Sequence, residues 1–148
     1  MKKIFTIAAI ALMGLALFSG CSKSDSTPSY TMKESIGGTS FSSSNCLSAS
    51  YSGIFTEIYG FEGNSVTPTY PYIGLFLINY AKTTGTFTID STMTSNFAQI
   101  VTSATTNKLA KTGTITITSV SPNIVGTFSF TVTDGTAVTG GTFTAKSY

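Results

Sequence analysis

The residue types that most often carry catalysis or bind metals are scarce in this chain. Of its 148 residues, none is histidine and two are cysteine, Cys21 and Cys46. Histidine is the usual general base near neutral pH, and it activates the nucleophile in Ser-His-Asp and Cys-His arrangements. Structural zinc sites likewise use histidine or several cysteines. The composition excludes these arrangements, and we expect no catalytic residue, no metal and no cofactor.

Paired carboxylates are the catalytic chemistry that the composition leaves open. Glycoside hydrolases place two acids on either side of the bond that they cleave, and the candidates here are Glu57, Glu62 and Asp90. Glu62 begins the turn-like sequence Glu62-Gly63-Asn64, and the acids form no Asp-x-Asp-x-Asp calcium loop. Ordinary solvated carboxylates are the simpler interpretation. We predict that the chain is not an enzyme, with a carboxylate-dependent glycan hydrolase as a remote alternative.

Residues 1–20 have the layout of a signal peptide. Lys2 and Lys3 precede a run without charge that ends in small residues before a cysteine. The apolar part of this run is about 15 residues long, whereas an α-helix needs roughly 20 to cross a bilayer. We therefore expect a helical, cleaved signal peptide rather than a transmembrane helix.

The sequence Leu17-Phe18-Ser19-Gly20-Cys21 resembles the lipobox of bacterial lipoproteins. In that family two small residues and a preceding aliphatic residue, here replaced by Phe18, lead to an obligatory cysteine. The resemblance implies cleavage before Cys21, a diacylglycerol thioether on its thiol, and a further acyl chain such as palmitate on its amine. Several acyl chains anchor a protein stably. Ser22, where an inner-membrane lipoprotein has aspartate, favours the outer membrane and leaves the periplasmic or surface face open.

The chain after residue 20 has nearly balanced charge. It contains 128 of the 148 residues, enough for one domain, and it lacks the two leader lysines that account for the net charge of +2. It has no arginine, and its six lysines are scattered among six acids. Nucleic-acid binding depends on clustered basic side chains. We therefore expect no nucleic-acid partner.

Lipid on Cys21 leaves Cys46 as the one free thiol, so we expect no intrachain disulfide. We interpret Cys46 as a small buried hydrophobe. Residues 21–29 are rich in serine and lack large apolar side chains, which is typical of a flexible tether. The predicted organisation is a signal peptide over 1–20, the lipidated cysteine and tether over 21–29, and one β-domain over 30–148.

Within residues 30–148, Ser and Thr alternate with Ile, Val, Phe and Tyr, which is the period of half-buried strands. The clearest example is Ile124–Val132, and the Asp134-Gly135 dipeptide that follows suits a tight hairpin turn. We predict a hairpin to Ala137–Lys146. The apolar residues of that second strand change phase at Gly140-Gly141, which predicts a β-bulge.

About nine strands are expected in all, with Gly37-Gly38 as a further hairpin turn. They are Tyr30–Ile36, Cys46–Tyr51, Ile54–Phe61, Tyr72–Tyr80, Gly85–Ile89, Phe97–Ser103, Thr112–Val120, Ile124–Val132 and Ala137–Lys146. Glycines such as Gly113 and Gly126 recur before Thr and an apolar residue, and we interpret them as relieving crowding where strands begin. Short, evenly separated strands indicate an all-β fold, a single antiparallel β-sandwich or flattened barrel.

The segment Tyr72–Tyr80 is apolar on both faces. Ile73, Leu75 and Leu77 share one face, and Tyr72, Phe76, Ile78 and Tyr80 share the other. A central strand covered on both sides explains this pattern. The alternative is a binding surface to which nearby aromatic residues contribute rings with polar tips. Its members would be Tyr59, Phe61, Tyr70 and Tyr72.

The region from Gly113 onward resembles small Thr- and Ser-rich envelope lipoproteins of Gram-negative bacteria, which form a domain of unknown function. The Gly-Thr-Phe-Ser/Thr strands and the Asp-Gly hairpin carry the resemblance. We predict a membrane-anchored, non-catalytic binding or structural module with a protein or glycan partner. The alternative is a lipocalin-like carrier that encloses a small apolar ligand. The sequence leaves the oligomeric state undetermined.

Overall fold

The structure, a computed structural model, describes residues 29–51, 54–63 and 68–147. The predicted signal peptide, Cys21 and nearly all of the tether lie outside these residues. Within the described ranges every regular element is a β-strand, which confirms the all-β prediction. The same ranges contain no helix that is long and apolar enough to cross a membrane.

The described residues form ten strands, one more than predicted. They are β1 (Thr31–Ile36), β2 (Thr39–Ser43), β3 (Asn45–Tyr51), β4 (Phe55–Gly63), β5 (Pro68–Ile78), β6 (Gly85–Asp90), β7 (Phe97–Ser103), β8 (Thr106–Ser119), β9 (Ile124–Val132) and β10 (Ala137–Ser147). The additional strand is β2. Its one large apolar residue, Phe41, gives no alternation from which a strand could be predicted.

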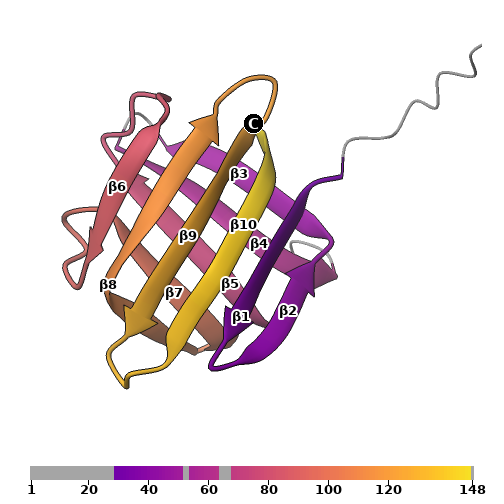
Figure 1. Cartoon of the computed structure of the whole chain (residues 1–148), viewed down its shortest axis with the longest axis vertical. Coiled ribbons are helices and arrows are strands. Elements are labelled where there is room, and N and C mark those ends of the chain that lie inside the picture. The colour runs from indigo at the N-terminus through magenta and orange to yellow at the C-terminus, as the bar shows by residue number, and fades with distance from the viewer. Residues whose placement is uncertain (1–28, 52–53, 64–67, 148) are drawn as a thin grey trace, which may run out of the picture.

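The strands form two layers that cross each other in Figure 1. The front layer contains, in order, β6, β8, β9, β10, β1 and β2, and the rear layer contains β3, β4, β5 and β7. Within each layer neighbouring strands are antiparallel. The predicted succession of Thr112–Val120, Ile124–Val132 and Ala137–Lys146 is confirmed as β8, β9 and β10.

Two strands join the layers and close them into a barrel. The first part of β8 pairs with β7, and its later part pairs with β9. At the other side, Lys146 and Ser147 of β10 pair in parallel with Leu47 and Ser48 of β3. The closed ring is β3-β4-β5-β7-β8-β9-β10, with β6 beside β8 and the β1–β2 hairpin beside β10. The prediction of purely antiparallel pairing is wrong at β3–β10, because a closed ring of seven strands cannot alternate direction at every neighbour.

Apolar side chains from both layers fill the barrel. On β9 the predicted inner face is confirmed: Ile124, Phe128, Phe130 and Val132 are each at most 4% exposed. From the rear layer the core receives residues that are fully buried, Ile58, Ile73, Leu75 and Leu77. Cys46 is a free, fully buried thiol in the same core, as predicted.

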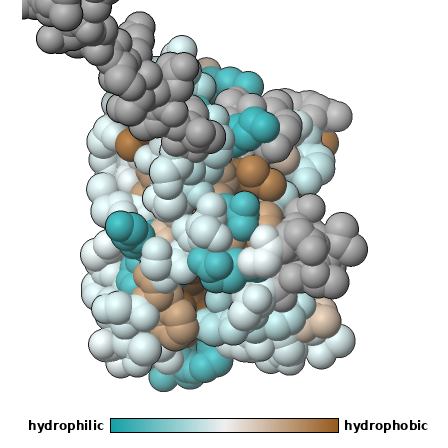
Figure 2. Space-filling model, turned by 90° about the vertical axis from the view of Figure 1, so that its right-hand side faces the viewer, coloured by the Kyte–Doolittle hydropathy of each residue, from teal (hydrophilic) through white to brown (hydrophobic). Residues whose placement is uncertain are grey.

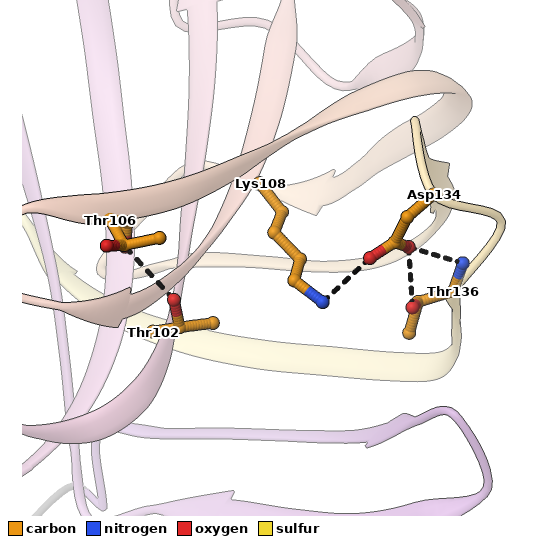
Figure 3. Close-up of polar contacts among 5 residues, drawn as sticks. All are labelled: Thr102, Thr106, Lys108, Asp134 and Thr136. Atoms are coloured by element: carbon orange, nitrogen blue, oxygen red, sulfur yellow. Dashed lines mark hydrogen bonds and ion pairs between the residues drawn. The ribbon is translucent and has the colours of Figure 1, made fainter.

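The β9–β10 hairpin forms at Asp134-Gly135, as predicted (Figure 3). Gly135 has a φ of 89°, and Asp134 Oδ1 accepts hydrogen bonds from Thr136 N at 2.9 Å and Thr136 Oγ1 at 2.7 Å. Lys108 Nζ donates to Asp134 Oδ2 at 2.7 Å. These contacts, led by Lys108, lower the pKa of Asp134. The predicted bulge is also present, because the β9–β10 register shifts between Val138 and Gly141.

Two strands, β5 and β8, differ most from prediction, and β5 begins at Pro68 rather than Tyr72. The strand β5 ends at Ile78 because Asn79 adopts a φ of 51°, so Tyr80 does not extend its outer face. The Tyr80 ring instead packs edge-on against Phe87 at 5.4 Å, and its hydroxyl donates to Thr83 O. The strand β8 begins at Thr106 rather than Thr112. Its first residues alternate too weakly to predict a strand, and pairing with β7 holds them in the sheet.

Candidate functional site

The rear layer has one side in the core and the other side directed away from it. Ile58, Leu75 and Ile100 point into the core. Because side chains alternate along a strand, the residues next to them on each strand point outward. Cross-strand register sets these outer residues side by side. We call this set the aromatic face: Tyr51, Phe55, Glu57, Tyr59, Phe61, Tyr70, Tyr72, Gly74, Phe76, Ile78, Phe97, Gln99 and Val101.

Four rings form a row across the face from β3 to β7. The ring centroids are 4.7 Å apart for Tyr51 and Phe55, 6.1 Å for Phe55 and Phe76, and 4.2 Å for Phe76 and Phe97. The last two rings are tilted by only 6°. Because Phe76 and Phe97 stack on each other, each has one flat side occupied by its neighbour. Much of the exposed surface of these two rings is therefore ring edge.

The four residues predicted as a ligand surface lie on this face in two pairs. Tyr59 and Phe61 stack along β4 at 5.4 Å, and Tyr70 and Tyr72 stack along β5 at 5.6 Å. Tyr70 is 37% exposed, and Tyr59 and Tyr72 are half-buried. Phe61 is only 3% exposed although it is not part of the barrel core. It therefore supports the neighbouring rings rather than presenting its own.

Glu57 is the charged residue of the aromatic face. It is directly opposite Phe76, and Phe55 and Tyr59 flank it along β4. Its side chain is half-buried, and this burial raises the pKa of its carboxyl group. Among the described residues it has no hydrogen-bond or ion-pair partner. The pKa of Tyr72 is also raised, mainly by burial. The charges of Tyr70 and Glu57 make smaller contributions in the same direction.

Amide side chains and a glycine complete the middle of the face. Asn107 Nδ2 donates to Gln99 Oε1 at 2.6 Å. A Cβ atom on Gly74 would lie 3.0 Å from Phe76 Cε2 and 3.4 Å from Gln99 Cγ. The glycine therefore leaves room for the Phe76 ring and the Gln99 side chain to lean over β5.

The three acids considered for hydrolysis have separate surroundings. Glu62 accepts hydrogen bonds from Ser44 N at 2.7 Å and Ser44 Oγ at 2.9 Å. Asp90 accepts from Thr92 N, Thr92 Oγ1 and Ser95 Oγ, and these bonds lower its pKa. The prediction of a turn that begins at Glu62 is wrong, because Glu62 and Gly63 belong to β4 and pair with β5. Glu62 holds the connection between β2 and β3, Asp90 stabilises the turn after β6, and Glu57 lies on the aromatic face. Across the described ranges, His, Cys, Asp and Glu form no group of three or more that could hold a metal ion.

A shallow hollow lies along the β1–β2 hairpin, away from the aromatic face. It is lined by Lys33, Glu34, Ser40, Phe41, Thr139 and Gly140, among others. In Figure 2, which views the side that carries this hairpin, hydrophobic patches are small and separated by polar surface. Glu34 is buried, and its Oε2 atom has no hydrogen-bond partner within the described part of the chain. The hollow is open, and it lies outside the barrel core.

Comparisons with known proteins give no match. This holds for protein-family models, for curated proteins and for solved structures. The aromatic face is therefore interpreted from its own geometry and chemistry.

Sequence reasoning missed part of this face. Tyr51, Phe55 and Phe97 were not among the predicted surface residues, and Glu57 was considered only as a catalytic acid. Alternation through Phe55, Glu57 and Tyr59 does place these three on one side of a strand. Alternation within one strand does not say which residues of the next strand lie opposite, so it could not predict that Phe55 and Glu57 lie beside Phe76 and Phe97.

Proposed function

We propose that this chain is a membrane-anchored envelope lipoprotein whose β-domain is a non-catalytic binding module, with the aromatic face as its binding surface. The observation that carries the proposal is the row of partly exposed rings across four strands of the rear layer. Contiguous exposed apolar surface commonly marks an interaction site. Tyr and Phe are enriched at protein interfaces.

The membrane is the first proposed partner, through lipid on Cys21. The lipobox resemblance of residues 17–21 supports this anchor, and Ser22 supports the outer membrane over the inner one. The apolar Cys46 environment leaves that thiol unsuited to lipidation or exchange, since burial raises its pKa to about 12. Cys21 is thus the cysteine to which we assign the lipid.

Two alternative functions have weaker support. A carrier of a small apolar ligand needs a cavity of about 300 Å³ or more, whereas side chains such as Ile58, Leu75 and Phe128 occupy the barrel interior. A hydrolase needs two acids that converge on one bond. Two of the candidate acids have separate hydrogen-bond partners: Glu62 accepts from Ser44, and Asp90 accepts from Thr92.

Binding by the aromatic face is tested by changing Tyr59, Tyr70 and Tyr72 individually to Ala in the chain from Ser22 onward. Glycan arrays and pull-downs with isolated envelope proteins measure capture. We expect at least one Tyr variant to lose about 5- to 30-fold in affinity, as for interface residues worth 1–2 kcal/mol.

The matched control is Met93→Ala, because Met93 is an exposed apolar residue outside the face. Its capture should equal that of the wild type. Unchanged capture by all three Tyr variants would reject the aromatic face as the binding surface.

A further inference from the structure

The aromatic face contains one carboxylate, that of Glu57, whose negative charge the surrounding rings do not neutralise. Glu57 is half-buried among Phe55, Tyr59 and Phe76, and no described residue gives it a hydrogen bond or an ion pair. A desolvated carboxylate without a partner is costly, and a cation that binds it recovers much of that cost. The other members of the aromatic face are uncharged. The lysine nearest in register is Lys146 of β10, which pairs with Leu47 beyond Tyr59 and not with a neighbour of Glu57.

The same charge pattern selects against several ligand classes. Phosphate groups, acidic sugars and anionic lipid headgroups would meet the Glu57 carboxylate among these rings, and Lys146 lies at the edge of the layer, beside Leu47 rather than beside Glu57. Sugar rings stack best on an open aromatic face, but Phe76 and Phe97 use a flat side of each ring to stack on each other. A cationic group with apolar surroundings is the chemistry that fits both features.

We propose that the partner of the aromatic face is a protein segment that presents one basic side chain between apolar side chains, with Glu57 receiving the basic group. This inference rests on the proposed binding function and names the class of partner. Arginine suits the site best, because its planar guanidinium group can donate two hydrogen bonds to one carboxylate. The neighbouring rings, Phe55, Phe76 and Phe97, would cover the apolar residues on either side of that arginine.

The proposal is tested with two labelled peptides and the full chain in detergent micelles. One probe is acetyl-Leu-Leu-Arg-Leu-Leu-amide, and the other replaces arginine by citrulline, which keeps the shape and removes the charge. Fluorescence anisotropy gives the two dissociation constants. We expect the arginine peptide to bind at least about tenfold more tightly, a difference of about 1.4 kcal/mol.

Variants assign this preference to the carboxylate. In Glu57→Gln the two peptides should have equal dissociation constants, whereas in Glu57→Asp the arginine peptide should still bind somewhat more tightly. Glu62→Gln is the matched control, because it removes one negative charge from the same strand outside the face. Circular dichroism verifies that each variant is folded.

Several outcomes would overturn the proposal. These are equal binding of both peptides, binding of neither at millimolar concentration, or an arginine preference that persists in Glu57→Gln. Binding to phosphatidylcholine vesicles that is independent of Glu57 would identify a lipid surface instead. Capture of a neutral glycan that depends on Tyr72 but not on Glu57 would reject this inference and leave the proposed binding function standing.

Discussion

Glu34 shows what one buried acid does to the stability of this barrel. It is 6% exposed, and burial raises its pKa to about 7. Because the folded chain holds this proton more tightly than the unfolded chain, the stability contributed by Glu34 is greatest below about pH 4.5. That contribution falls as pH rises towards 7. The shift corresponds to at most about 3 kcal/mol, at 1.4 kcal/mol per pKa unit.

Glu34→Gln is therefore expected to remove part of the pH dependence of folding. The variant should be more stable than the wild type at pH 8, by about 1–3 kcal/mol, and should lose this advantage at pH 4. Urea unfolding at both pH values measures the difference. Glu62→Gln serves as a control for an exposed acid, and equal pH dependence in wild type and Glu34→Gln would contradict the expectation.

At the scale of strands, three glycines allow β8, β9 and β10 to pack closely. Gly113 is directly opposite Phe130, Gly126 is opposite Phe143, and Gly141 is opposite Phe128. A Cβ atom on any of these glycines would lie 2.4–2.6 Å from an atom of the opposing phenylalanine. Each phenylalanine thus covers the glycine across from it. The prediction that such glycines lie where strands begin is wrong for these three, which lie within strands, whereas Gly85 does begin β6.

Gly126→Ala is expected to lower the free energy of unfolding by about 1–3 kcal/mol. The added methyl group would lie 2.3 Å from Thr116 O and 2.6 Å from Phe143 Cζ, so a backbone atom would have to move. Urea denaturation measures the change. Thr127→Ala, at an exposed position of the same strand, should shift stability by less than about 0.5 kcal/mol. A Gly126→Ala variant as stable as that control would show that the strands accommodate the added methyl group, and it would contradict the expectation.

The whole molecule combines a closed barrel with a proposed lipid anchor. The outer side of the rear layer, β3-β4-β5-β7, forms the aromatic face. The front layer is extended by β6 at one edge and by the β1–β2 hairpin at the other. Within the described residues no disulfide contributes, since Cys46 is free. Packing of the core therefore holds the described part of this domain together, and the proposed anchor would determine where it acts.

The anchor is tested by metabolic labelling with a palmitate analogue. The wild type should incorporate label and sediment with membranes, because each buried methylene contributes about 0.8 kcal/mol to membrane binding. Cys21→Ser should incorporate none, whereas Cys46→Ser should label like the wild type. Equal labelling of the wild type and Cys21→Ser would reject lipidation at that residue.

The sequence by itself determined the features that depend on near neighbours in the chain. Alternation predicted the inner face of Ile124–Val132, Asp134-Gly135 predicted the hairpin, and the change of phase at Gly140-Gly141 predicted the bulge. Cys46 was predicted to be buried, and it is. Strand period and turn geometry are local, so a single sequence is sufficient to derive them.

Only the tertiary structure decided which strands meet and which side chains they bring together. The parallel contact between β10 and β3 that closes the ring joins residues almost 100 positions apart. The row from Tyr51 to Phe97 exists because register aligns β3, β4, β5 and β7. Alternation places Glu57 on one side of a strand, but it contains no information about which residues of another strand lie opposite. That pairing depends on the packing of the whole barrel. It places Glu57, which has no partner among the described residues, among aromatic rings.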